Sequence, residues 1–128
     1  MRICAAVIGA GSWGTTVAHL LAHNSSTVLW ARDPEVARSV QDDHLNRRYL
    51  ADHPLHQELR ATHSLAEAVT QADLVVMGVP SHGFRSALEQ VAEHVRAWVP
   101  IVSLTKGLEQ GTRRRMTEVI NDVLPGHP

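Results

Sequence analysis

The feature that most constrains this fold is a glycine-rich segment near the start of the chain. An apolar run over residues 2–8 leads directly into Gly9-Ala10-Gly11-Ser12-Trp13-Gly14, after which an amphipathic stretch covers residues 15–22. A strand, the spacing GxGxxG and a helix, in this order, are typical of a dinucleotide-binding βαβ unit. The bare spacing also fits an ordinary strand-to-helix turn, and it is the flanking strand and helix that favour a nucleotide.

Each glycine of this segment has its own expected role in holding a pyrophosphate. Gly9 permits the tight turn, Gly11 lets the pyrophosphate approach the backbone, and Gly14 lets the helix pack closely on the strand. The amide groups and the positive dipole at the helix N-terminus then bind the phosphates without a charged side chain. We therefore expect all three glycines to belong to a cofactor site.

The rest of the chain alternates apolar runs of strand length with amphipathic stretches. Helices are predicted at 34–43, from residue 64 to before residue 73, and at 83–97, and strands at 2–8, 27–31, 60–62, 74–79 and 99–104. This alternation predicts an α/β fold of the Rossmann type, a doubly wound, mostly parallel sheet of about five strands. Residues 1–128 fit one dinucleotide-binding domain, and the aperiodic segment 44–58 predicts a long functional loop.

Composition excludes several classes of partner. The 12 basic and 13 acidic residues give a formal charge of -1, which provides no broad footprint for nucleic acid or an anionic membrane. No apolar run approaches the ~20 residues that span a bilayer, and the apolar start enters the glycine turn without a cleavage region, so we expect a cytoplasmic location. The single Cys4 predicts a small buried hydrophobic residue rather than a nucleophile.

Nine histidines raise the question of a metal site. The pairs to consider are His19 with His23, four residues apart, and His53 with His56. Neither pair has an acidic or cysteine partner at a telling spacing, and a structural zinc site needs four ligands. We expect no metal, and we place His19 and His23 on the outer face of the first helix.

The end of the second predicted strand bears on the choice of nucleotide. NAD-selective folds place an acidic residue there to bind the ribose hydroxyls, whereas NADP-selective folds often place an arginine nearby. Ala31 stands where the acid is expected, and Arg32 beside it can pair with a 2'-phosphate. NADP is therefore favoured as the cofactor, while NAD stays open because Asp33 can still reach a ribose.

Two further segments end strands at the same edge of the sheet. Val79-Pro80-Ser81-His82 should line the cofactor site, with His82 as a polar cap or pocket wall rather than a general base. Lys106 should face the cleft, where a cation suits an anionic substrate or a developing oxyanion. From position alone, a surface lysine is an equally good interpretation. The run Arg113-Arg114-Arg115 is expected to form the solvated face of a terminal helical stretch.

Five blocks in the same order give the chain a family resemblance. Together they resemble bacterial NAD(P)-dependent glycerol-3-phosphate dehydrogenase: 9–15, 29–34, Asn46 to Leu50, 79–82 and 105–109. The resemblance implies interconversion of dihydroxyacetone phosphate and sn-glycerol 3-phosphate for phospholipid synthesis. It also implies that Ser12 and Trp13 contact the cofactor, Arg32 its adenosine end, Tyr49 its neighbourhood, and Lys106 both cofactor and substrate.

The same resemblance implies that part of the enzyme is missing after Pro128. Family members continue into a helical substrate domain that carries the catalytic lysine, so we expect no catalytic residue in this chain and no activity from it alone. An uncovered sheet edge would then favour a homodimer. Two other interpretations stay open: a dinucleotide-binding or redox-sensing module without chemistry, and another NAD(P)-dependent reductase with the same cofactor fold.

Overall fold

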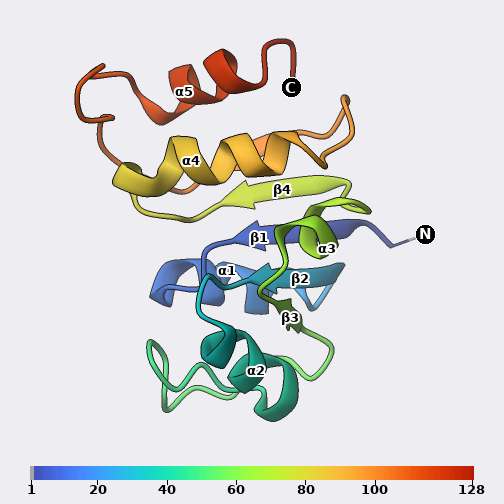
Figure 1. Ribbon diagram of the computed structural model, residues 1–128. Helices are drawn as coiled ribbons and strands as arrows, with labels where there is room; N and C mark the ends of the chain where they lie inside the picture. Colours follow the sequence, from blue (N-terminus) through green and yellow to red (C-terminus); the bar gives the residue numbers. More distant parts are fainter. Residues whose placement is uncertain (1) are drawn as a thin grey trace.

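The structure is a computed structural model that describes residues 2–128 (Figure 1). Its central sheet has the order β3-β2-β1-β4-β5, and all four strand pairings are parallel. The strands are β1 (Cys4–Ile8), β2 (Ser26–Trp30), β3 (Arg60–Thr62), β4 (Leu74–Met77) and β5 (Ile101–Ser103). The predicted Rossmann-type sheet of five strands is confirmed. Because the chain builds outward from β1 in both directions, the switch point lies between β1 and β4.

Helices cover both faces of the sheet. They are α1 (Ser12–Leu21), α2 (Pro34–Asp43), α3 (Leu65–Val69), α4 (Ser81–Ala92) and α5 (Met116–Val123). Ile8 and Met77 belong to a core with α3, α4 and α5, whereas their neighbours Val7 and Val76 belong to a second core with α1 and α2. Successive strand residues thus point to opposite layers, as expected for a parallel sheet buried on both sides.

The helix starts follow the capping signals in the sequence. The side chain of Asp33 accepts a hydrogen bond from the Glu35 amide (2.9 Å) at the start of α2. Ser64 accepts one from the amide of Glu67 (3.2 Å) at the start of α3. Each bond satisfies one of the amides that a helix N-terminus leaves without a backbone partner. Both predicted caps are confirmed.

Two predicted elements in the C-terminal half are too long, and only the helix differs by more than three residues at one end. The helix predicted at 83–97 is α4, which begins at Ser81 and ends at Ala92. The chain turns there because the amides of His94 and Val95 both bond to the carbonyl of Val91, and Arg96 reaches back to the carbonyl of Ala72 (2.6 Å). The strand predicted at 99–104 is only β5, since Pro100 has no amide to donate. The other predicted elements agree to within three residues.

The three consecutive arginines do not lie in a helix, contrary to the prediction. Arg113 has a positive φ of 59°, and Arg115 is the N-cap of α5, where Glu118 closes a capping box. Arg114 pairs with Asp122 (2.6 Å) on α5. A left-handed residue ends any helix before this point, so the run forms a turn, from which Arg114 and Arg115 pair with carboxylates of α5.

No helix among residues 2–128 combines the length and apolar character required to cross a membrane.

Candidate functional site

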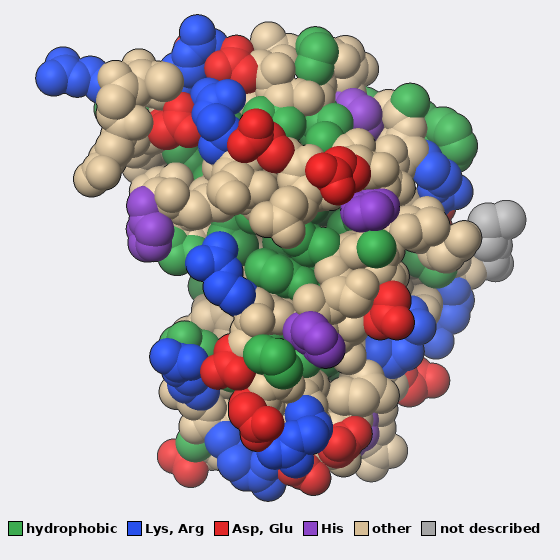
Figure 2. Space-filling model, in the orientation of Figure 1, with side chains coloured by type: hydrophobic (Ala, Val, Ile, Leu, Met, Phe, Trp, Pro, Cys, Tyr) green, Lys and Arg blue, Asp and Glu red, His purple; other side chains and the backbone are tan. Residues whose placement is uncertain are grey.

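A pocket of about 450 Å³ opens at the carboxyl ends of β1, β2 and β4. Its wall comes from four stretches of chain: residues 9–11, residues 30–33 with Val36, residues 48–49, and residues 78–83 without Ser81. Figure 2 shows it as a hollow on the side to which the arrowheads of Figure 1 point, with hydrophobic side chains at its floor. Open α/β sheets bind ligands at this edge, beside the switch point.

The three glycines of the turn have different surroundings. Gly9 has a φ of 120°, and a Cβ atom there would lie 2.8 Å from the backbone of Gly78. A Cβ atom on Gly14 would lie 2.0 Å from the carbonyl oxygen of Gly9. A Cβ atom on Gly11, by contrast, would meet nothing within 4 Å, and Gly11 lines the pocket. The fold therefore requires Gly9 and Gly14, while Gly11 leaves open space in the pocket.

The first turn of α1 presents amide donors beside this open space. Gly11 is the N-cap, no side chain caps the helix, and the first intrahelical bond runs from the amide of Thr15 to the carbonyl of Gly11 (3.0 Å). The amides of residues 12–14 thus have no intrahelical partner, and no acidic side chain lies in this turn. An anion in the pocket would meet free donors and the positive end of the helix dipole.

A buried asparagine fastens the long loop to the glycine turn. Asn46 is fully buried, and its Nδ2 donates to the carbonyl of Ala10 (2.9 Å) and to Oγ1 of Thr15 (2.9 Å). Its Oδ1 accepts from the amide of Tyr49 (3.2 Å), and Ser12 Oγ donates to the carbonyl of Tyr49 (3.2 Å). These bonds hold Tyr49 against the glycine turn, so the predicted loop forms a wall of the pocket.

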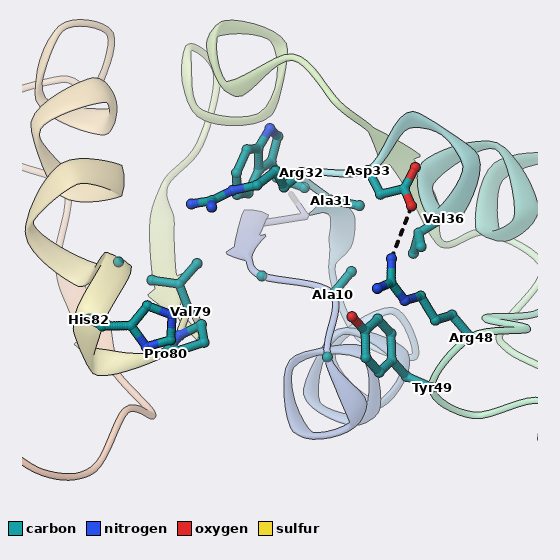
Figure 3. A pocket seen from close by; sticks show the side chains of 15 residues that line it. Ala10, Ala31, Arg32, Asp33, Val36, Arg48, Tyr49, Val79, Pro80 and His82 are labelled. Carbon is teal, nitrogen blue, oxygen red and sulfur yellow. Dashed lines mark hydrogen bonds and ion pairs between the residues drawn. The ribbon is translucent and has the colours of Figure 1, made fainter.

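The loop also brings a cation to the end of β2. Arg48 Nη1 lies 3.1 Å from Oδ2 of Asp33, and its guanidinium lies 5.3 Å from the ring centre of Tyr49. Figure 3 shows Arg48, Asp33 and Tyr49 on the same side of the pocket. Arg48 has no role in the sequence-based hypothesis, because its partner Asp33 lies fifteen residues away along the chain. The only available signal was its position in an aperiodic loop.

The opposite side of the pocket carries Arg32 and His82. In Figure 3 the side chain of Arg32 extends toward α4, and its Nη2 would lie 3.6 Å from a Cβ atom built on Gly83. Arg32 makes no ion pair with any of residues 2–128. His82 follows Pro80 and forms part of the wall, as predicted for this block. One guanidinium on this side thus remains free for an anion.

The structure brings together most of the residues predicted for the cofactor site. Gly9, Gly11, Arg32 and Tyr49 line the pocket. Its lining does not include Ser12, Trp13 and Gly14, which lie in the adjoining first turn of α1: Gly14 is buried and Trp13 is 59% exposed.

Lys106 is set apart from this group. It lies after β5, is exposed, and does not line the pocket. Its neighbour Thr105 donates to the carbonyl of Val79 (2.5 Å), and a Cβ atom on Gly107 would lie 4.0 Å from Oγ of Ser81. Lys106 therefore belongs to the same edge of the sheet as the start of α4, beyond the far end of the pocket.

His19, His23 and His56 form a cluster, and of the two residues predicted on the outer face of the first helix, His23 is exposed. His19 is only partly exposed, contrary to the outer-face prediction, because its Nδ1 accepts from the amide of His56 (2.9 Å) in the long loop. The ring centre of His23 lies 5.1 Å from that of His19 and 4.7 Å from that of His56. Within residues 2–128 no three or more His, Cys, Asp or Glu side chains are arranged to hold a metal ion.

Comparisons with known proteins agree on one family. Residues 4–128 match the family model described as NAD-dependent glycerol-3-phosphate dehydrogenase N-terminus. An NAD(P)+ glycerol-3-phosphate dehydrogenase of Sphingopyxis alaskensis is 53% identical over 128 residues, which are all of this chain and 38% of that protein. One of Mycobacterium avium is 54% identical over 123 residues, 95% of this chain and 36% of that protein. The chain spans less than two-fifths of either relative.

The same likeness holds in three dimensions. The crystal structure of glycerol-3-phosphate dehydrogenase from Coxiella burnetii superimposes with a TM-score of 0.90 at 28% sequence identity. The match covers 98% of this chain and 39% of that chain.

Proposed function

The chain belongs to the family of NAD-dependent glycerol-3-phosphate dehydrogenase N-terminal domains, and from this premise we propose that its pocket binds a nicotinamide adenine dinucleotide. Residues 1–128 act as one dinucleotide-binding domain in this proposal. The sheet, the switch point and the glycine turn stand where such folds bind the cofactor.

One observation carries the proposal most directly. Of the three glycines in the turn, only Gly11 has open space for a Cβ atom, and Gly11 lines the pocket. The two others are packed against backbone atoms. An ordinary strand-to-helix turn needs its glycines for packing or for backbone angles, and Gly11, with a φ of -71°, is needed for neither. A ligand that passes close to the backbone accounts for it.

The proposed contacts follow from this placement. The pyrophosphate lies across Gly9, Gly11 and Gly14 and accepts hydrogen bonds from the free amides of the first turn, including those of Ser12 and Trp13. The adenosine end lies at the carboxyl end of β2, and the nicotinamide points toward β4 and the start of α4. Lys106 follows β5 at the carboxyl edge of the sheet, near the start of α4. In this proposal it contacts the nicotinamide end of the cofactor and the substrate.

For the adenosine end we propose Arg32 and Tyr49 as contacts and NADP as the preferred cofactor. Arg32 has no carboxylate partner among residues 2–128 and can turn its guanidinium to a 2'-phosphate. The ring of Tyr49, which is 44% exposed, is held at the pocket wall. NAD lacks the phosphate and would use the same pocket without this ion pair.

In the complete reaction that we propose, dihydroxyacetone phosphate is reduced to sn-glycerol 3-phosphate, a precursor of phospholipids; NAD(P)H would supply the hydride for the carbonyl carbon and become NAD(P)+, and the carbonyl oxygen would take up a proton. The ammonium group of Lys106 would lie near the substrate phosphate or hydroxyl groups and offset their charge. No residue of this chain is assigned as the general acid. We also propose that the protein acts in the cytoplasm.

A fluorescence titration tests the binding step. Trp30 lines the pocket and Trp13 adjoins it, whereas Trp98 precedes β5 at the other edge of the sheet, 64% exposed. In a Trp98→Phe background we expect saturable quenching by NADPH and weaker quenching by NADH. Arg32→Gln should reduce NADPH affinity toward that of NADH. If neither nucleotide gives a saturable change in the folded chain, the proposed function is wrong.

A further inference from the structure

Both carboxylate oxygens of Asp33 already have partners in this structure. Oδ1 accepts from the amide of Glu35 (2.9 Å) as the N-cap of α2, and Oδ2 accepts from Arg48 Nη1 (3.1 Å). An acid at the end of the second strand is the group that holds the adenosine ribose in NAD-selective folds. Here that carboxylate lines the pocket but is directed toward α2 and the loop (Figure 3).

The partner Arg48 is positioned by contacts that are independent of Asp33. It lies between Asn46, which is buried and bonded to the glycine turn, and Tyr49, whose amide and carbonyl are both bonded. Its guanidinium lies 5.3 Å from the ring centre of Tyr49. A guanidinium has five N–H donors, and the bond to Asp33 uses one of them. The remaining donors are available to an anion in the pocket.

The charge balance of the pocket lining is positive. Arg32, Asp33 and Arg48 are the charged side chains of its lining, two cations and one anion. Glu35, which lies close by on α2, is paired with Arg38 (2.5 Å). A phosphate here would meet a net cation, whereas a bare ribose would find no free carboxylate.

We propose that Arg48 is a specificity-determining residue that selects dinucleotides with a 2'-phosphate on the adenosine ribose. It acts in two ways: it holds the Asp33 carboxylate away from the ribose, and it adds a second guanidinium to that of Arg32. The inference rests on the proposed function, that the pocket binds a nicotinamide adenine dinucleotide. NADPH and NADH differ only in the 2'-phosphate, so their affinity ratio isolates the effect.

The test compares Arg48→Gln with a matched control, Arg47→Gln, in the 128-residue chain. Arg47 is the preceding residue, pairs with Asp43 on α2 (2.6 Å), and does not line the pocket. In Arg48→Gln we expect NADPH to bind about tenfold more weakly, as for the loss of one charge-assisted hydrogen bond. NADH should bind equally or more tightly, because Asp33 is released. Arg47→Gln should leave both affinities unchanged.

A second variant separates the two roles of Arg48. Asn at position 33 keeps an N-cap but has no charge, so Arg48→Gln with Asp33→Asn retains the cap of α2 and removes the released carboxylate. Any gain in NADH affinity seen in Arg48→Gln should disappear in the double variant, while the loss of NADPH affinity should remain. Circular dichroism checks that each variant is folded.

The outcomes separate this inference from the proposed function. If Arg48→Gln changes the two affinities by the same factor, or changes neither while Arg32→Gln abolishes the preference, Arg48 is not a specificity determinant and the cofactor site stands. If the folded wild-type chain binds neither nucleotide, both the inference and the proposed function fail. A selective loss of NADPH affinity in Arg48→Gln supports both.

Discussion

Alanine at Gly11 should leave the fold intact and abolish tight nucleotide binding. The backbone of Gly11 is extended (φ -71°, ψ -176°), and its Cβ atom would meet nothing within 4 Å. Alanine is a poorer N-cap than glycine by a few tenths to about 1 kcal/mol, and it restricts the unfolded chain by about 0.4–1 kcal/mol. These two effects oppose each other, so we expect stability to change by less than about 0.5 kcal/mol.

Gly14→Ala is the matched variant, because the same methyl group is added one helical turn away. Its Cβ atom would lie 2.0 Å from the carbonyl oxygen of Gly9 and 3.1 Å from the carbonyl carbon. These are backbone atoms of the turn between β1 and α1, so the helix has to move. Overpacking of this kind destabilises by about 1–3 kcal/mol or more. For a chain of this size the larger value lowers Tm by roughly 10 °C.

Thermal unfolding followed by circular dichroism and titration with NADPH distinguish the two positions. Gly11→Ala should unfold within about 2 °C of the wild type and bind NADPH at least about tenfold more weakly, since the methyl group separates the phosphates from the amides of α1. Gly14→Ala should instead show a lowered Tm, by up to roughly 10 °C. Unchanged NADPH affinity in Gly11→Ala would refute the placement of the pyrophosphate, and equal Tm values in the two variants would refute the packing argument.

Three other changes test separate parts of the structure. Asn46→Ala should lower the unfolding free energy by about 2–3 kcal/mol, because it leaves buried groups of the turn unpaired; urea titration checks this. Burial and two nearby histidines lower the pKa of His19, so stability should fall as pH drops below 6.5, and less steeply in His19→Gln. Arg85 lowers the pKa of Glu109 to about 2, so Arg85→Gln should destabilise above pH 4.5 and converge with the wild type near pH 2.

Features that are encoded locally were predictable from the sequence. The alternation of apolar runs gave all five strands, and the caps at Asp33 and Ser64 located two helix starts. The wrong predictions concern segments whose conformation depends on tertiary contacts. The end of α4 depends on Arg96 reaching a carbonyl twenty-four residues away, and the run at 113–115 turns because a left-handed residue precedes α5. Neither contact has a periodic signal in the sequence.

In the candidate site, too, the local motif was predictable and the long-range contacts were not. The glycine spacing located one wall of the pocket, since Gly9 and Gly11 line it and Gly14 packs the first helix against the turn. The roles of Asn46 and Arg48 were not predictable, although the loop that carries them was. Their partners lie in the glycine turn and at the N-cap of α2, thirty-six and fifteen residues away respectively. Only the folded sheet brings these segments together.

Residues 46–49 of the loop are held by a different kind of contact from the sheet, so the pocket wall and the fold can change separately. The sheet and helices are stabilised by two apolar cores, the second of which also contains Leu55 of the loop, whereas residues 46–49 of the loop are attached to α1 and its turn by hydrogen bonds of Asn46 and Ser12. A net hydrogen bond contributes about 1 kcal/mol, less than a buried aliphatic side chain. A change in these bonds therefore moves Arg48 and Tyr49 while the sheet stays intact, and it alters nucleotide affinity more than it alters the fold.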